Sequence, residues 1–171
     1  MYTDPAELDV PRPDGTLRVL RWGRGPRHAV ALHGITASAA AWLPVAEALP
    51  TEWSLFAVDL RGRGHSGELP GPYGFGRHAE DVLAAVDHLG LEQPVLAGHS
   101  LGAYLALLIA DQAPGTFAGC CWRTGGCRCR SRTAWTWTRC WTPASAPRWP
   151  GCGRRIPASR RTSTSGGPTR P

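Results

Sequence analysis

The chain of 171 residues contains no lysine, and its other absences each belong to one part of the sequence. Residues 1–119 have no cysteine, whereas residues 120–171 have no acidic residue, no histidine, no leucine and no valine. So few aliphatic side chains cannot bury enough apolar surface to offset the entropy lost on folding, which excludes a second packed domain there. We therefore expect two parts, an ordered core over 1–119 and an unstructured tail over 120–171.

Charge divides the chain at the same place. Residues 1–119 carry eight arginines and all thirteen acidic residues, whereas residues 120–171 carry eleven arginines and all six cysteines. The formal net charge of +6 is thus an average over two unlike parts. Because lysine codons are rich in adenine, a chain without lysine and rich in arginine and alanine also indicates a GC-rich gene.

Segments that would direct the chain to a membrane or to secretion are not apparent. No apolar stretch reaches the length that spans a bilayer, and residues 1–15 lack the basic start and apolar run of a signal peptide. From the sequence we expect a cytoplasmic protein that does not associate with membranes. Its oligomeric state is left open.

Strand and helix patterns alternate along the first 119 residues. Pro13-Asp14-Gly15 is a turn signal between two short strand patterns, and the later strand patterns are short apolar runs. Strands are expected at 8–10, 16–22, 28–34, 53–60 and 94–100, and helices at 41–50, 77–90 and 101–114. Gly90 stands at a helix C-cap position. This alternation predicts an α/β domain with a mostly parallel sheet.

One pentapeptide, Gly98-His99-Ser100-Leu101-Gly102, fits the pattern G-x-S-x-G. It follows a buried strand and opens a helix, which is the context in which such a turn exposes a serine nucleophile. The turn leaves no room for a Cβ two residues before or after the serine. The hydroxyl would stand above a helix N-terminus, whose dipole favours negative charge. The alternative is a serine that merely caps the helix.

Two further motifs precede that turn, LHGITASAAAW at 32–42 and VDLRGRGHSG at 58–67. With AGHSLG at 97–102, in this order and spacing, residues 8–119 resemble the α/β-hydrolase superfamily in its single-domain serine esterase and lipase-like branch. The resemblance implies an α/β-hydrolase fold with flanking helices, truncated after the nucleophile helix. It also implies hydrolysis of an ester or related acyl bond in a small molecule, with no cofactor and no metal.

The resemblance also assigns roles to individual residues. Ser100 would be the nucleophile, and the backbone N–H groups of Ile35 and Leu101 would form the oxyanion hole. His33 and Gly34 would shape the loop that carries Ile35. Haloalkane dehalogenases and epoxide hydrolases of this superfamily carry aspartate at the nucleophile position, so the serine favours acyl chemistry.

Other acidic and histidine residues are weaker candidates. Asp59 follows a strand and could be an acid, although in the family this position usually orders the next loop. His99 is adjacent to the nucleophile, but in such a turn its side chain points away from Ser100. The remaining histidines are expected at ordinary loop, surface or helix positions, namely His28, His65, His78 and His88.

The chain lacks the partners that a serine nucleophile needs. In the family, the acid and the histidine follow the nucleophile along the sequence. All six histidines precede Ser100, and no acidic residue or histidine follows Gly119. Without a base the serine keeps its proton and is a poor nucleophile. We therefore find no catalytic histidine and expect this chain to be inactive.

The composition after Gly119 is explained by a shift of reading frame. With GC-rich codons, reading from one base earlier turns the segment that begins Cys120-Cys121-Trp122 into LLLADG, an apolar strand that ends in an acid. Later text becomes rich in proline and aspartate, with helical spacing that resembles the start of a cap over the active site. Our hypothesis is that one base was lost near the Gly119 codon. The strand that ends at Ser100 would then be left as an exposed sheet edge.

Two other interpretations of residues 120–171 stay open. The cysteines could bind zinc or form disulfides, although their spacing does not match the usual metal-binding pattern. Arginines interleaved with tryptophans could bind single-stranded nucleic acid without sequence specificity. The alternative to a serine hydrolase is accordingly a non-catalytic, decayed hydrolase fragment or a protein with a basic segment that adheres to nucleic acid.

Overall fold

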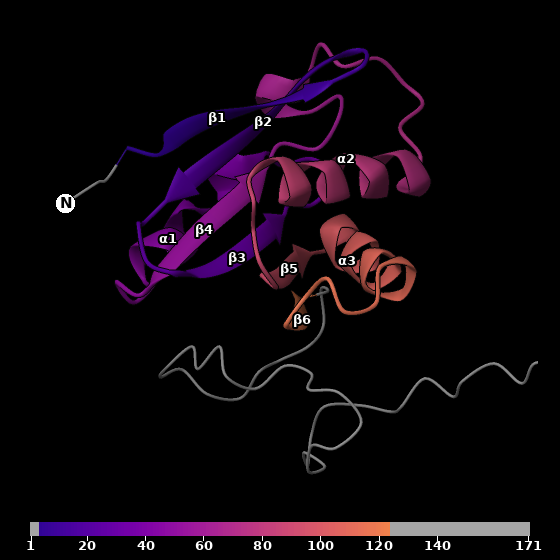
Figure 1. Ribbon diagram of the computed structural model, residues 1–171. Helices are drawn as coiled ribbons and strands as arrows, with labels where there is room; N and C mark the ends of the chain where they lie inside the picture. Colours follow the sequence, from indigo (N-terminus) through magenta and orange to yellow (C-terminus); the bar gives the residue numbers. More distant parts are fainter. Residues whose placement is uncertain (1–3, 124–171) are drawn as a thin grey trace, which may run out of the picture.

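A six-stranded sheet organises the part of the chain that the computed structural model describes, residues 4–123 (Figure 1). The strand order across the sheet is β1-β2-β4-β3-β5-β6. Strands β3 to β6 are mutually parallel, and β2 joins them antiparallel to β4. The bounds are β1 Ala6–Arg12, β2 Gly15–Trp22, β3 Arg27–Leu32, β4 Trp53–Val58, β5 Val95–His99 and β6 Gly119–Arg123. The mostly parallel α/β fold expected from the sequence is confirmed.

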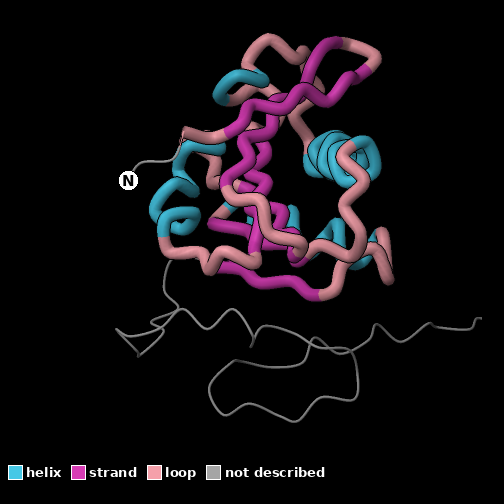
Figure 2. Tube along the Cα trace, turned by 60° about the vertical axis from the view of Figure 1, so that its left-hand side comes forward, coloured by secondary structure: helices cyan, strands magenta, loops and turns pink. Residues whose placement is uncertain are grey.

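Helices cover both faces of this sheet (Figures 1 and 2). On one face lie α2 (Phe75–His88) and α3 (Leu101–Gln112), and on the other lie the short 3-10 helix η1 (Ala39–Trp42) and α1 (Leu43–Glu47). Side chains alternate along β3 accordingly. Val30 and Leu32 belong to the core under α2 and α3, whereas Ala29 and Ala31 belong to the core under η1 and α1.

The helix expected at 41–50 differs from the observed structure. It is shorter and is divided into η1 and α1, with Pro44 at the start of α1. Proline fixes its own φ and has no N–H to donate, so it suits the first turn of a helix rather than the middle of one. Among the helices of residues 4–123, none has the length and apolar character needed to cross a membrane.

Helix α2 ends as the sequence indicates. The N–H of Gly90 donates to the carbonyl of Asp87 at 3.0 Å, and that of Leu91 donates to Val86 at 3.0 Å. These two bonds form a Schellman motif, which requires a left-handed residue directly after the helix. Gly90 adopts φ 60°, a conformation that glycine reaches without steric cost.

The ordered core extends past the expected boundary at Gly119, because it includes strand β6. This strand continues past Gly119 to Arg123 and pairs in parallel with β5, from Val95↔Gly119 to His99↔Arg123. The expectation that β5 forms an exposed edge is therefore wrong. A ladder is made by backbone groups, which cysteine and tryptophan supply as well as leucine does, and Cys120 is only 4% exposed in the core. Within residues 4–123 the edge strands are β1 and β6.

A buried arginine joins the hairpin, the loop after β4 and α2. Arg61 is 1% exposed, and it donates from Nε and Nη2 to the two carboxylate oxygens of Asp81 at 2.7 and 3.0 Å. It also donates from Nη1 and Nη2 to Asp14 at 2.6 and 3.1 Å, and from Nη1 to the carbonyl of Pro70. The hydrogen bonds of Asp14 and Asp81 raise the pKa of Arg61, so its charge is permanent.

Candidate active site

Ser100 is the single residue between β5 and α3. Its backbone has φ 52° and ψ −114°, outside the regions that are open to residues with a Cβ. Its side chain makes no capping hydrogen bond to α3, so the interpretation of Ser100 as a helix cap does not hold. The residue is partly exposed at the carboxyl edge of the sheet. Strain of this kind persists only where the surrounding structure imposes it.

The two glycines of the turn are required by packing. A Cβ on Gly98 would lie 2.3 Å from the carbonyl oxygen of Gly102, and a Cβ on Gly102 would lie 2.2 Å from that of Leu32. Both distances are far below van der Waals contact, and both neighbours are backbone atoms. The first turn of α3 therefore rests directly on the ends of β5 and β3, as the sequence motif predicts.

The loop after β3 passes beside the serine. A Cβ on Gly34 would lie 3.3 Å from His99 Nδ1 and 3.4 Å from the Cβ of Ser100. Ile35 follows Gly34 and is 55% exposed, and Leu101 follows Ser100 as the first residue of α3. Both residues line one pocket, so the two predicted oxyanion-hole residues lie at the same place in the fold.

His33 is buried and fastens this loop to the neighbouring strand. Its Nε2 accepts the N–H of Leu60 at 3.0 Å, so the proton is on Nδ1, which lies 2.7 Å from the carbonyl oxygen of Gly34. Burial lowers the pKa of His33 below its ordinary value and keeps the ring neutral. Both ring nitrogens are thus occupied, and His33 is not free to act as a base toward Ser100.

Asp59 is also occupied by backbone partners. Its Oδ1 accepts the N–H of Ala39 at 2.6 Å, and its Oδ2 accepts that of His65 at 2.9 Å. Gly64 passes so close that a Cβ there would lie 2.3 Å from the carboxylate. Asp59 is 2% exposed and holds the loops after β3 and β4 together, which is the loop-ordering geometry rather than that of an acid paired with a histidine.

Among residues 4–123, no histidine is hydrogen-bonded to the Ser100 hydroxyl. His65, His88 and His99 are exposed, and His28 is half-buried on β3 with its ring edge-on to Phe56. Within the same range, no three metal-ligating side chains gather at one point. The cysteine spacings considered for zinc extend to residues outside the described part of the chain.

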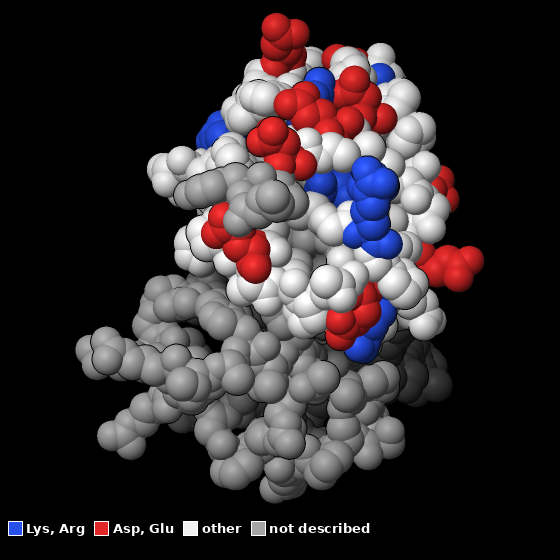
Figure 3. Space-filling model, turned by 90° about the vertical axis from the view of Figure 1, so that its left-hand side faces the viewer, with Lys and Arg blue, Asp and Glu red and all other residues white. Residues whose placement is uncertain are grey.

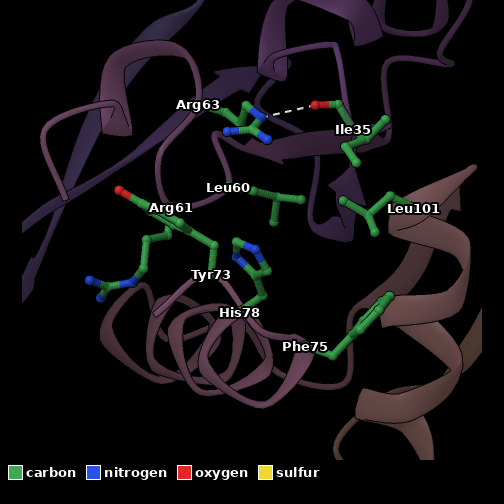
Figure 4. A pocket seen from close by; sticks show the side chains of 8 residues that line it. All are labelled: Ile35, Leu60, Arg61, Arg63, Tyr73, Phe75, His78 and Leu101. Atoms are coloured by element: carbon green, nitrogen blue, oxygen red, sulfur yellow. Dashed lines mark hydrogen bonds between the residues drawn. The ribbon is translucent and has the colours of Figure 1, made fainter. Parts of the chain in front are cut away.

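A pocket of about 100 Å³ lies beside the turn (Figure 4). It is bounded by the loop after β3, the loop after β4, the start of α2 and the start of α3. Its lining residues are Ile35, Leu60, Arg61, Arg63, Tyr73, Phe75, His78 and Leu101. Ile35 and Leu101 could be assigned to this place from sequence motifs, whereas the other lining residues could not, because they come from segments far apart in the chain.

The position of His78 differs from the expected ordinary surface or helix position, because its side chain is buried. It is 6% exposed, and burial lowers its pKa. The signal was present in the sequence, because His78, Val82 and Val86 are spaced at four residues and share one face of α2. Val82 and Val86 are buried in the core, so a histidine in line with them is buried as well.

Comparison with known proteins identifies relatives of this architecture. A model of the alpha/beta hydrolase fold family matches residues 30–129, more than half of the chain. The N-formylmaleamate deformylase of Pseudomonas putida is 43% identical over 99 residues, which cover 56% of this chain and 37% of that protein. The dihydrolipoyllysine-residue acetyltransferase component of the acetoin cleaving system, also from Pseudomonas putida, is 37% identical over 101 residues, 57% of this chain and 27% of that protein.

Solved structures show the same likeness. The crystal structure of E-2-(acetamidomethylene)succinate hydrolase superposes with a TM-score of 0.62 and 29% identity, over 68% of this chain and 43% of that chain. The matched part of this chain thus corresponds to about a third of the length of the two curated relatives.

Proposed function

Because the chain belongs to the alpha/beta hydrolase fold family, we propose that it represents a serine hydrolase that acts on an ester or related acyl bond in a small molecule. The observation that carries this proposal is the backbone of Ser100, held at φ 52° between β5 and α3. Gly98 and Gly102 permit that conformation by leaving space that a Cβ would fill.

In the proposed reaction, the Ser100 oxygen attacks the carbonyl carbon of the substrate. Negative charge then develops on the carbonyl oxygen, and the N–H groups of Ile35 and Leu101 would donate hydrogen bonds to it. The serine proton must pass to a base, which in this family is a histidine beyond the nucleophile in sequence. The names of two relatives, a deformylase and an acetyltransferase component, support chemistry at an acyl carbon.

We propose that the 171-residue chain is inactive. All of its histidines precede Ser100, His33 has both ring nitrogens occupied, and Asp59 is held by two backbone amides. We attribute the missing partners to a frame shift near Gly119, after which residues 120–171 are out of frame. A cytoplasmic location, the absence of a cofactor and the absence of a specific nucleic-acid partner stay predictions from the sequence.

Hydrolysis of a p-nitrophenyl ester tests the proposal. We expect no turnover by the 171-residue chain above that of its Ser100→Ala variant. We expect the frame-corrected protein to hydrolyse the ester and to lose roughly 10⁴-fold or more of kcat in Ser100→Ala. Ser38→Ala, which removes a hydroxyl that caps no helix, is the matched control and should keep its activity. Turnover by the frame-corrected protein that survives Ser100→Ala would refute the nucleophile.

The frame shift has its own test in the DNA. Resequencing across the Gly119 codon should reveal a lost base, or codons after it that read as an apolar strand in the neighbouring frame. Codons that do not encode an apolar strand in the neighbouring frame would refute the frame-shift hypothesis. The second candidate function, a decayed fragment with a basic segment, rests on the eleven arginines without an acidic residue in residues 120–171.

A further inference from the structure

The pocket beside Ser100 is mainly apolar and small. Its apolar lining comes from Ile35 and Leu101, which follow Gly34 and Ser100 in sequence, and from Leu60 and Phe75 (Figure 4). A volume of about 100 Å³ admits a short acyl chain and little more. Two walls come from the residues that directly follow Gly34 and Ser100, so the pocket lies next to the proposed nucleophile in the fold.

Arg63 brings an uncompensated positive charge to the rim of the pocket. Its Nε donates to the carbonyl of Ile35 at 2.9 Å, and its Nη1 donates to the carbonyl of Gly62 at 2.9 Å. Within residues 4–123 it pairs with no carboxylate, and its Nη2 has no protein partner. Arg61 differs, because its charge is balanced by Asp14 and Asp81 and its guanidinium points away from the other lining side chains (Figure 4).

His78 presents an unsatisfied polar atom in the same pocket. The side chain is 6% exposed, and within the described residues its Nδ1 has no hydrogen-bond partner. Its ring points toward Leu60 (Figure 4). Burial lowers its pKa, Asp81 and the backbone of Tyr73 oppose that effect, and the charges of Arg61 and Arg63 lower the pKa further. A neutral ring with a free nitrogen can donate one hydrogen bond to a ligand, and a buried polar atom without a partner is costly.

We propose that this pocket selects acyl substrates that carry a carboxylate, with Arg63 pairing to the carboxylate and the imidazole of His78 donating an N–H to one of its oxygens. The substrate class is then an ester or amide of a short dicarboxylic acid. The carbonyl under attack lies at Ser100, and the second carboxylate lies in the pocket. The inference rests on the proposed function of Ser100 for the reaction, but the binding of a carboxylate does not need the serine hydroxyl.

Butyrate and butyramide separate charge from shape, because they have nearly the same size and only butyrate is anionic. We expect butyrate to shift the ring resonances of His78 saturably in NMR spectra of the ¹⁵N-labelled 171-residue chain. Butyramide should bind at least about tenfold more weakly, since a charge-assisted hydrogen bond is worth more than a neutral one. In a thermal unfolding experiment, butyrate should raise the midpoint and butyramide should not.

Variants assign the effect to residues. Arg63→Gln should weaken butyrate binding about tenfold or more, because the ion pair is lost. Arg24→Gln removes an exposed arginine outside the pocket and should leave the affinity unchanged. His78→Phe, which keeps a ring in an apolar setting, should weaken butyrate binding and leave butyramide binding as it was.

Ser100→Ala distinguishes this inference from the proposed function. If Ser100→Ala binds butyrate as the parent chain does, the pocket stands whatever the outcome of the ester assay. Equal affinity for butyrate and butyramide would overturn the inference. The inference would also be overturned if Arg63→Gln bound butyrate as tightly as the parent chain. It would be overturned as well if Arg24→Gln lost as much butyrate affinity as Arg63→Gln.

Discussion

At the scale of single residues, the turn at the candidate site depends on two positions that have no side chain, Gly98 and Gly102. Ser100 has a backbone conformation that costs of order 1–3 kcal/mol, and it persists because Gly98 and Gly102 let α3 press onto the strand ends. The polar side chains of His33 and Asp59 are not free, because each accepts hydrogen bonds from backbone N–H groups. Under the proposed function, reactivity at this site would depend on Ser100 and on a base supplied from elsewhere.

Gly98→Ala should lower the free energy of unfolding by about 2 kcal/mol or more, because its Cβ would meet backbone atoms of Gly102 that cannot move aside. Gly76→Ala is the control within the same chain. It lies in α2 with no atom within 4 Å of the added Cβ, and it should raise the free energy of unfolding by about 0.5–1 kcal/mol. Urea denaturation measures both, and equal effects of the two substitutions would contradict the packing argument.

At the scale of elements, buried ion pairs and backbone caps hold the loops that surround the pocket. Arg61 joins three segments, since Asp14 lies in the turn of the hairpin and Asp81 lies in α2. Asp81 also accepts a hydrogen bond from Arg12 of β1 at 2.8 Å. These contacts fix the start of α2, which supplies Phe75 and His78 to the pocket.

Arg61→Met should lower the free energy of unfolding by about 3–5 kcal/mol, because it leaves the buried carboxylate of Asp81 without its bidentate partner. Arg24→Met removes the same charge at an exposed position, and its free energy of unfolding should stay within about 0.5 kcal/mol of that of the parent chain. Chemical denaturation at neutral pH gives both values. An Arg61→Met chain as stable as Arg24→Met would show that the cluster does not hold these segments together.

At the scale of the whole molecule, the distribution of charge is uneven along the sequence. All thirteen acidic residues lie before residue 120, and eleven of the nineteen arginines lie after residue 119. On the face shown in Figure 3, acidic side chains of the described residues gather in the upper part, and a group of basic side chains lies below them. Because residues 1–119 carry thirteen acidic residues and eight arginines, we expect an interaction with nucleic acid to depend on the eleven arginines of residues 120–171.

We expect the chain to bind single-stranded RNA without sequence preference, with an affinity that falls at least about tenfold as salt rises from roughly 50 to 200 mM. Fluorescence anisotropy with several unrelated oligonucleotides of equal length measures both properties. A preference of more than about tenfold for one sequence, or an affinity that salt leaves unchanged, would indicate an evolved binding site and favour the second candidate function.

The sequence alone determined the order of the five strands up to β5 and of helices α2 and α3, the turn around Ser100 and the glycine that ends α2. These features depend on periodicity and on steric contacts between residues near one another in the chain, and a pattern of residues records both. It could not reveal the ion pair of Arg61 and Asp14, which joins residues 47 positions apart, because no local pattern links them.

Only the tertiary structure decided which side chains share the pocket and where the sheet ends. Arg63 and His78 meet there because β4 lies beside β3 and α2 packs across the same face. Strand β6 forms beside β5 although its composition is unlike that of the other strands, because backbone hydrogen bonds do not depend on side-chain type. Pairing between strands distant in sequence thus determines which residues surround Ser100, while steric contacts within the turn determine the backbone conformation of Ser100.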